Sequence, residues 1–94
     1  MSFQFSEENG RFVAKDDQGL EAGEVTFTRD GEDVLVIDHT GVDPAQRGQG
    51  LAEELVRHVV EKAKNEGKKI VPLCSFAKKE FEKNADYKEV LANQ

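Results

Sequence analysis

A glycine-rich segment, Arg47-Gly48-Gln49-Gly50, comes directly before a stretch of helical periodicity. A loop of this composition leaves its backbone N–H groups uncovered by side chains. The start of the following helix adds more unpaired N–H groups and the positive end of the helix dipole. Because a diphosphate suits such a site, the segment predicts a site for a small phosphorylated ligand. The alternative is a plain turn before an amphipathic helix.

Two common phosphate-binding patterns do not fit this loop. A Walker A loop ends in Gly-Lys-Ser/Thr, and the residues after Gly50 include neither the lysine nor the hydroxyl. A dinucleotide fingerprint requires a third glycine where Glu53 stands, and that carboxylate would oppose a pyrophosphate. A third pattern, Arg/Gln-x-x-Gly-x-Gly/Ala, is satisfied by residues 47–52.

The elements that position the loop follow from the apolar pattern. Alternating and β-branched residues predict strands over 2–6, 11–16, 20–29 and 34–42, the last of which is the strongest β-branched run. Beyond the loop the apolar residues recur at helical spacing and predict a helix that ends at Gly67. Its expected buried stripe is Ala52, Leu55, Val56, Val59, Val60 and Ala63.

The last third of the chain predicts a short strand and a second helix. Residues 69–74 read as a buried strand that Pro72 interrupts. Ser75 is the expected N-cap of a helix over 75–84, which should bury Phe76, Ala77 and Phe81, and the tail is expected to add a last helical turn. The order of elements predicts an α/β fold whose sheet is antiparallel at first. A helical crossover then joins the last two strands in parallel.

Length, charge and cysteine content restrict the class of protein. With 94 residues the chain is expected to form a single domain, residues 1–94. The 13 basic and 19 acidic residues give a net charge of −6, which argues against a nucleic-acid or membrane-surface partner. The N-terminus lacks the pattern of a signal peptide, and no apolar run approaches the ~20 residues that cross a bilayer. With one cysteine, these features predict a cytoplasmic protein.

Residues 42–55, V-D-P-x-x-R-G-x-G-x-A-x-x-L, resemble the acetyl-CoA-binding segment of the GNAT superfamily of acyl-CoA N-acyltransferases. Residues 77–87, AKKEFEKNADY, are similar to the closing A-x-x-F-Y-E-K-x-G-F segment of that superfamily. Over about residues 10–92 the chain also resembles a narrower group of very short, stand-alone GNAT-like domains with a Pro-Leu-Cys segment. The resemblance implies a mostly antiparallel sheet with strands four and five parallel and splayed. A long helix follows strand four, and one or two short helices end the chain.

The resemblance also implies how acetyl-CoA would bind as co-substrate. Its pantetheine arm would enter the gap between strands four and five, facing Thr40, Gly41 and Val42. Its pyrophosphate would lie on Arg47, Gly48, Gln49, Gly50, Leu51 and Ala52. Lys79 and Lys83 are candidates for the 3′-phosphate, with a solvated helix face as the alternative. No metal site is expected.

The resemblance implies no proton donor at residue 81, because Phe81 stands where many members of the superfamily carry a tyrosine that donates a proton. Cys74 is a candidate for an acyl-cysteine intermediate or for the proton donor, and the alternative is a buried core cysteine. His39 is a candidate base or partner of Cys74, and the alternative is a structural or exposed histidine. Asp38 is expected on the opposite face from His39, and His58 is expected to face solvent.

Three functions remain open on this evidence. The first is an acyl-CoA-dependent N-acetyltransferase that acts on an unknown amine, either a small molecule or a protein. The second is a domain that binds CoA or acetyl-CoA without turnover, as a sensor or interaction module. The third is a plain interaction domain in which the glycine loop is only a turn.

Overall fold

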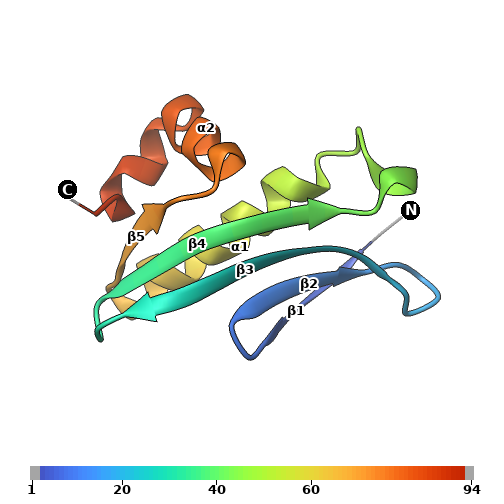
Figure 1. The fold of residues 1–94 in the computed structure, drawn as a ribbon, viewed down its shortest axis with the longest axis horizontal. Helices are drawn as coiled ribbons and strands as arrows, with labels where there is room; N and C mark the ends of the chain where they lie inside the picture. Colours follow the sequence, from blue (N-terminus) through green and yellow to red (C-terminus); the bar gives the residue numbers. More distant parts are fainter. Residues whose placement is uncertain (1–2, 93–94) are drawn as a thin grey trace.

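A five-stranded sheet in the order β1-β2-β3-β4-β5 forms the framework of the protein, for which a computed structural model describes residues 3–92 (Figure 1). The first four strands pair as antiparallel neighbours, and β4 pairs with β5 in parallel. Helix α1 (Leu51–Glu66) makes the crossover between β4 and β5. The predicted order and the predicted change from antiparallel to parallel pairing are confirmed. The strands are β1 (Gln4–Glu8), β2 (Arg11–Lys15), β3 (Glu21–Asp30), β4 (Val34–Val42) and β5 (Lys69–Pro72).

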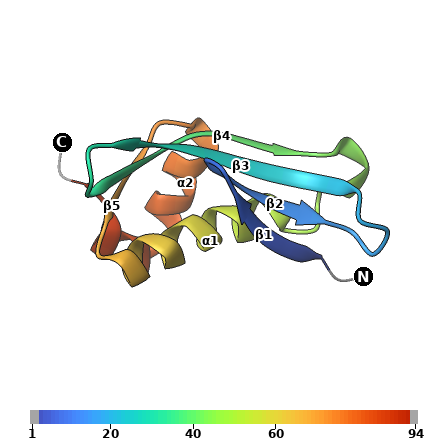
Figure 2. The same ribbon diagram turned by 90° about the horizontal axis from the view of Figure 1, so that it is seen from below.

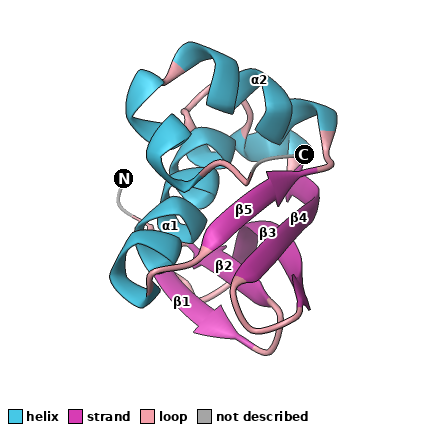
Figure 3. Cartoon of the chain, turned by 90° about the vertical axis from the view of Figure 1, so that its left-hand side faces the viewer, coloured by secondary structure: helices cyan, strands magenta, loops and turns pink. Residues whose placement is uncertain are grey.

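The helices lie together on one side of the sheet, and the core lies between the two layers (Figures 2 and 3). Helix α2 (Ser75–Lys83) and the 3₁₀ helix η2 (Ala85–Val90) follow β5, so the expected last helical turn is a 3₁₀ segment. After η2 the chain returns to the edge of β5, where the Ala92 N–H donates to the Ile70 carbonyl at 2.9 Å. No helix in residues 3–92 combines the length and the apolar character needed to cross a membrane.

Helix α1 buries an apolar stripe against the sheet. The observed stripe begins at Leu51, which is buried, whereas Ala52 is only half-buried; the predicted start is therefore wrong by one residue. Gly67 ends the helix in the left-handed conformation at φ 68°, and its N–H bonds to the carbonyls of Ala63 and Lys64. The position of the helix is thus fixed by burial at its centre and by a glycine at its end.

A β-bulge in β4 decides which side chains face the helices. Thr26 pairs with His39 while Phe27 pairs with Ile37, which leaves Asp38 as the extra residue. The Thr26 hydroxyl donates to Asp38 Oδ1 at 2.5 Å, and Asp38 and His39 are both exposed. The prediction that these two side chains point to opposite faces is therefore wrong, because a bulge breaks the strict alternation of a strand.

His58 also differs from its prediction. Its ring is half-buried and stacks on Phe5 with ring centroids 4.4 Å apart, and it lies 5.6 Å from the ring of Phe12. The histidine therefore packs β1 and β2 onto α1 instead of facing solvent. Nearby, Lys62 pairs with Glu7 at 2.9 Å and so adds a polar link between the same elements.

The buried stripe of α1 yields a stability prediction. Val59→Asp should unfold the protein, because an unpaired buried charge costs several kcal/mol and a small domain has only about 5 kcal/mol in total. Asn65→Asp adds the same charge to an exposed position of the helix and should change stability by less than about 0.5 kcal/mol. Thermal unfolding followed by circular dichroism measures both. A folded Val59→Asp variant with the wild-type midpoint would contradict the assigned face.

Candidate functional site

The backbone pairing between β4 and β5 stops halfway along β4. The last paired residues are Ile37 and Pro72, and the Ile37 carbonyl then accepts the N–H groups of both Leu73 at 3.0 Å and Cys74 at 3.2 Å. Pro72 does not end this ladder, because its nitrogen faces the other edge of β5, while Lys69 and Leu73 donate their N–H groups to the β4 side. From Asp38 onward β4 continues to Val42 while the chain after Pro72 turns into α2, so the two strands separate as predicted.

The edge of β4 beyond this point offers backbone groups to the gap. Asp43 donates its N–H to the Ala22 carbonyl of β3 at 2.8 Å. Because backbone groups alternate along a strand, the N–H of Gly41 also faces β3, while those of Thr40 and Val42 face the gap. This short stretch can therefore pair with an extended ligand that carries amide groups.

The glycine loop has the conformation that the sequence suggests. Gly48 and Gly50 lie at φ 85° and 76°, in the left-handed region, and a Cβ at either position would meet open space. Gly50 is the N-cap of α1, and the first helical bond runs from the Glu54 N–H to its carbonyl at 3.1 Å. No side chain of the described residues caps this helix. The first amides of α1 therefore remain available to an anion.

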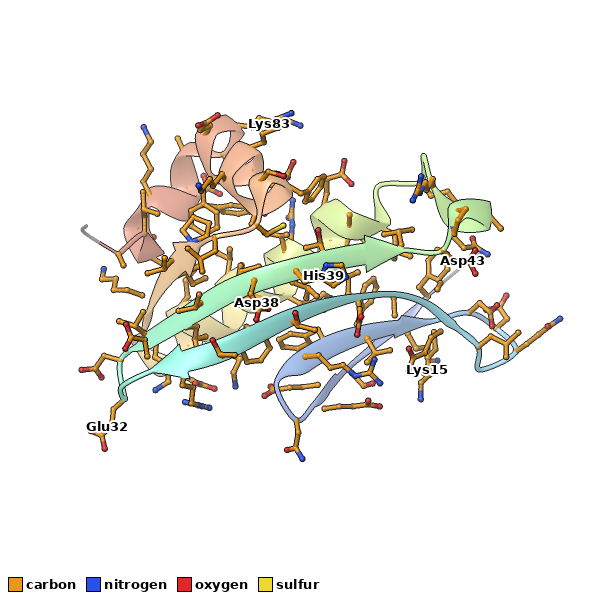
Figure 4. The ribbon with its side chains drawn as sticks, viewed as in Figure 1. Lys15, Glu32, Asp38, His39, Asp43 and Lys83 are labelled. Atoms are coloured by element: carbon orange, nitrogen blue, oxygen red, sulfur yellow. The ribbon has the colours of Figure 1, made fainter. Side chains whose placement is uncertain are left out.

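A 3₁₀ turn, η1 (Pro44–Gln46), joins β4 to this loop. Asp43, which lies at the start of this turn (Figure 4), accepts the Ala45 N–H with Oδ1 at 3.0 Å and so closes the turn. The side chain of Gln49 donates to Gln46 Oε1 at 2.9 Å and so ties the loop back to the turn. These bonds position the loop without using its own N–H groups.

A cleft of about 510 Å³ lies between the end of β4, the loop and the start of α1. It brings together every predicted cofactor-binding residue except Gln49. Arg47 and Glu53 give its lining one positive and one negative side chain, and Phe76 of α2 adds an aromatic wall. The lining residues from the prediction are Thr40, Gly41, Val42, Arg47, Gly48, Gly50, Leu51 and Ala52.

Cys74 lies beside this cleft, half-buried, at the N-cap of α2. The predicted cap was Ser75, so the prediction is wrong by one residue. Cys74 Sγ lies 3.5 Å from Thr40 Oγ1. Burial, the largest single influence, raises the pKa of the thiol. The N–H of Ala77, the hydroxyl of Thr40, and the N–H groups of Phe76 and Thr40 together outweigh burial, so that the pKa is lowered from its usual value.

His39 and Phe81, the other two residues of catalytic interest, lie apart from the sulfur. His39 is exposed on the uncovered face of the sheet (Figure 4), where a Cβ added at Gly41 would lie 3.1 Å from its Nε2. Phe81 is buried and packs against Tyr87 with ring centroids 5.3 Å apart. The structure therefore pairs Cys74 with Thr40, and not with His39.

Neither lysine considered for the 3′-phosphate lines the cleft. Lys79 is exposed, and Lys83 lies at the end of α2 away from β4 (Figure 4), 3.3 Å from Glu80 Oε2. Ala77 and Phe81 are buried as predicted, whereas Phe76 is only half-buried, so that part of the prediction is wrong; Glu80 is buried, which the apolar pattern does not indicate. Within residues 3–92 no three His, Cys, Asp or Glu side chains come together as metal ligands.

A family model described as GCN5-related N-acetyl-transferase matches residues 11–90. No protein of curated function matches the chain. Among solved structures, the chain is similar to a GCN5-like candidate N-acetyltransferase from Staphylococcus aureus, with 33% identity and a TM-score of 0.78. That match covers 97% of this chain and 89% of the other.

Two further structures were solved with coenzyme A bound. A GNAT-family N-acetyltransferase from Escherichia coli in complex with CoA has 35% identity and a TM-score of 0.59 over 67% of this chain, which spans 38% of that protein. N-acetylglutamate synthase from Neisseria gonorrhoeae, complexed with coenzyme A and N-acetyl-glutamate, has 22% identity and a TM-score of 0.65. The match covers 79% of this chain and 18% of the synthase chain, and at this identity it supports the fold alone.

The contact between Thr40 and Cys74 predicts the pH dependence of the thiol. Because the pKa of Cys74 is lowered, alkylation by iodoacetamide should reach half its maximal rate below the pH of an unperturbed thiol. Thr40→Val removes a hydrogen-bond donor, which should raise that pKa and slow alkylation at pH 7 by about threefold or more. Thr40→Ser should retain the wild-type profile, and Thr28→Val, on an exposed part of β3, is the matched control. A Thr40→Val profile that overlays the wild type would contradict the assignment.

Proposed function

Since the chain belongs to the GCN5-related N-acetyltransferase family, we propose that it binds acetyl-CoA in the cleft at β4 and transfers the acetyl group to an amine. The observation that carries this proposal is the gap beyond Ile37 and Pro72, which opens beside a glycine loop with free amides. One groove thus offers sites for both an extended amide chain and a diphosphate.

The free cysteine suits a reducing compartment, and we assign the activity to the cytoplasm.

The pyrophosphate of the donor would lie on the amides of residues 48–52. These amides and the dipole of α1 supply the attraction, because Arg47 is the one positive side chain that lines the cleft among residues 3–92, and Glu53 opposes it. The pantetheine arm would then run along β4, pairing with the backbone of Val42 and ending near Thr40. This path would bring the thioester close to Cys74.

The environment of Cys74 favours its role as a nucleophile over that of a proton donor, because a lowered pKa increases the thiolate fraction. The thiolate would attack the thioester carbonyl, the carbon–sulfur bond to CoA would break, and the CoA thiolate would take a proton from water. An unprotonated amine would then attack the acyl-cysteine, forming the amide and releasing the Cys74 thiolate. The ammonium formed in this step would lose its proton to solvent.

His39 has a different place in this proposal from the one expected beside Cys74. Its ring lies over Gly41 on the uncovered face of the sheet, so it would act as a base only for an amine that arrives from that side.

A non-catalytic domain that binds CoA is the second candidate function. The position of Phe81 favours it, because a buried phenyl ring supplies no proton where related enzymes carry a tyrosine.

Substitution of Gly50 tests donor binding. Gly50→Val places a branched side chain among the proposed phosphate-binding amides and should weaken acetyl-CoA binding at least about tenfold, or 1.4 kcal/mol. Gly19→Val is the matched control, because Gly19 has a similar positive φ, 80° against 76°, and the same open space around it. Both variants bear the same backbone strain of about 1–2 kcal/mol. Isothermal titration measures affinity, and equal losses in the two variants would contradict the assigned site.

Mass spectrometry tests the role of Cys74. Incubation with acetyl-CoA should add one acetyl group to Cys74, and a competent amine should remove it. Cys74→Ala should retain acetyl-CoA affinity and lose transfer, because the acyl-enzyme cannot form. Transfer by Cys74→Ala at the wild-type rate would show that the amine attacks acetyl-CoA directly. Stabilisation by acetyl-CoA without product from any amine would instead favour the non-catalytic domain.

A further inference from the structure

A second cleft, which the proposed donor site does not use, opens beside Cys74 at the edge of the sheet. Its volume is about 610 Å³, and its walls come from the end of β5, one side of α2, η2 and the segment after it. We call it the edge groove. The residues that matter for its chemistry are Leu73, Lys78, Phe81, Glu82, Lys88 and Leu91.

Cys74 stands between the donor cleft and the edge groove. On one side its sulfur contacts Thr40, which lines the donor cleft. On the other side the groove residue Leu73 precedes it directly, and the groove residue Lys78 donates its N–H to the Cys74 carbonyl at 3.0 Å. Lys78 lies about one helical turn and Phe81 about two turns beyond Cys74 on α2, so the groove extends along this helix from the residue next to the cysteine, Leu73.

The edge groove combines an apolar surface with local positive charge. Phe81 is only 4% exposed and packs into the core, whereas Leu73 is 58% exposed. Lys78 and Lys88 are exposed, and neither forms an ion pair within the described part of the chain. With Glu82 the groove carries two positive charges and one negative charge, on a chain whose net charge is −6. The groove therefore complements a ligand that has an apolar body and an anionic group.

We propose that the edge groove is the acceptor site and that it binds an apolar α-amino acid or a similar amine that bears a carboxylate. The apolar side chain would lie on Leu73 and Leu91, the carboxylate near Lys78, and the amine at Cys74. This inference rests on the proposed acetyl transfer. The donor would occupy the side of Cys74 that faces Thr40, and of the remaining approaches the edge groove, unlike the uncovered face beside His39, combines apolar side chains with two lysines.

Titrations of the CoA-saturated protein with three probes, observed by NMR, test the occupant. L-leucine should shift the methyl signals of Leu73 and Leu91. Isopentylamine is leucine without its carboxylate and should bind about two- to fivefold more weakly, because it lacks the group that the exposed lysines attract. Spermidine, a polycation, should give no shift in the groove. Equal binding of leucine and isopentylamine, or shifts confined to His39 and Gly41 on the uncovered face, would overturn the proposal.

Two pairs of variants complete the test. Leu73→Glu should weaken leucine binding at least about tenfold, whereas Leu20→Glu, at the other large apolar side chain exposed in residues 3–92, should not. Lys78→Glu should weaken it as well, and Lys79→Glu, next along the same helix but outside the groove, should not. Each variant is also titrated with acetyl-CoA. Unchanged acetyl-CoA binding with lost leucine binding supports the groove. If acetyl-CoA fails to bind the wild type, the proposed donor site is wrong. Titration of the free protein with leucine then still tests whether the edge groove binds an amino acid.

Discussion

The end of backbone pairing between β4 and β5 is the constraint on which the whole site depends. The Ile37 carbonyl accepts the N–H groups of both Leu73 and Cys74, which ends the ladder, and the bulge at Asp38 changes the alternation of β4 at the same level. As a result Thr40 and Val42, instead of His39 and Gly41, follow Leu35 and Ile37 on the side that faces the helices. The chain after Pro72 is then free to begin α2, which brings the thiol of Cys74 to Thr40. Without this separation the donor cleft would be closed by an ordinary parallel ladder.

Binding of an anion by so acidic a chain depends on backbone dipoles more than on side-chain charge. The described residues that line the donor cleft include one arginine and one glutamate, so the charges of its side chains nearly cancel. The amides at the start of α1 and in the glycine loop carry the attraction, and their partial charges are fixed by the fold. The same principle operates at Cys74, where the first amides of α2 favour a thiolate. Two helix N-termini thus face the two ends of the proposed donor path.

Local sequence patterns predicted most of the fold, and the family resemblance implied the residues that line the donor cleft. Strand β4, helix α1 and the glycine loop follow from apolar periodicity and from glycine content, which are local properties. The side-chain contacts at the site were less predictable, because they depend on a bulge in β4 that no residue type in this strand indicates. Alternation placed Asp38 and His39 on opposite faces. The position of His39 at a neighbouring strand end made it a candidate partner of Cys74, whereas Thr40 occupies that place. The burial of Glu80 was missed for a related reason, since it depends on how α2 is rotated against α1.

Amide hydrogen exchange at Val42 tests the central claim, which is that the free edge of β4 binds the pantetheine arm of acetyl-CoA. Val42 and its neighbour Gly41 lie on one strand, and their N–H groups face opposite sides, the gap and β3 respectively. Saturating acetyl-CoA should slow exchange at Val42 at least about tenfold more than at Gly41, since only the Val42 amide would gain a hydrogen-bond partner. Equal protection of both amides, or exchange at Val42 that acetyl-CoA leaves unchanged, would contradict the account.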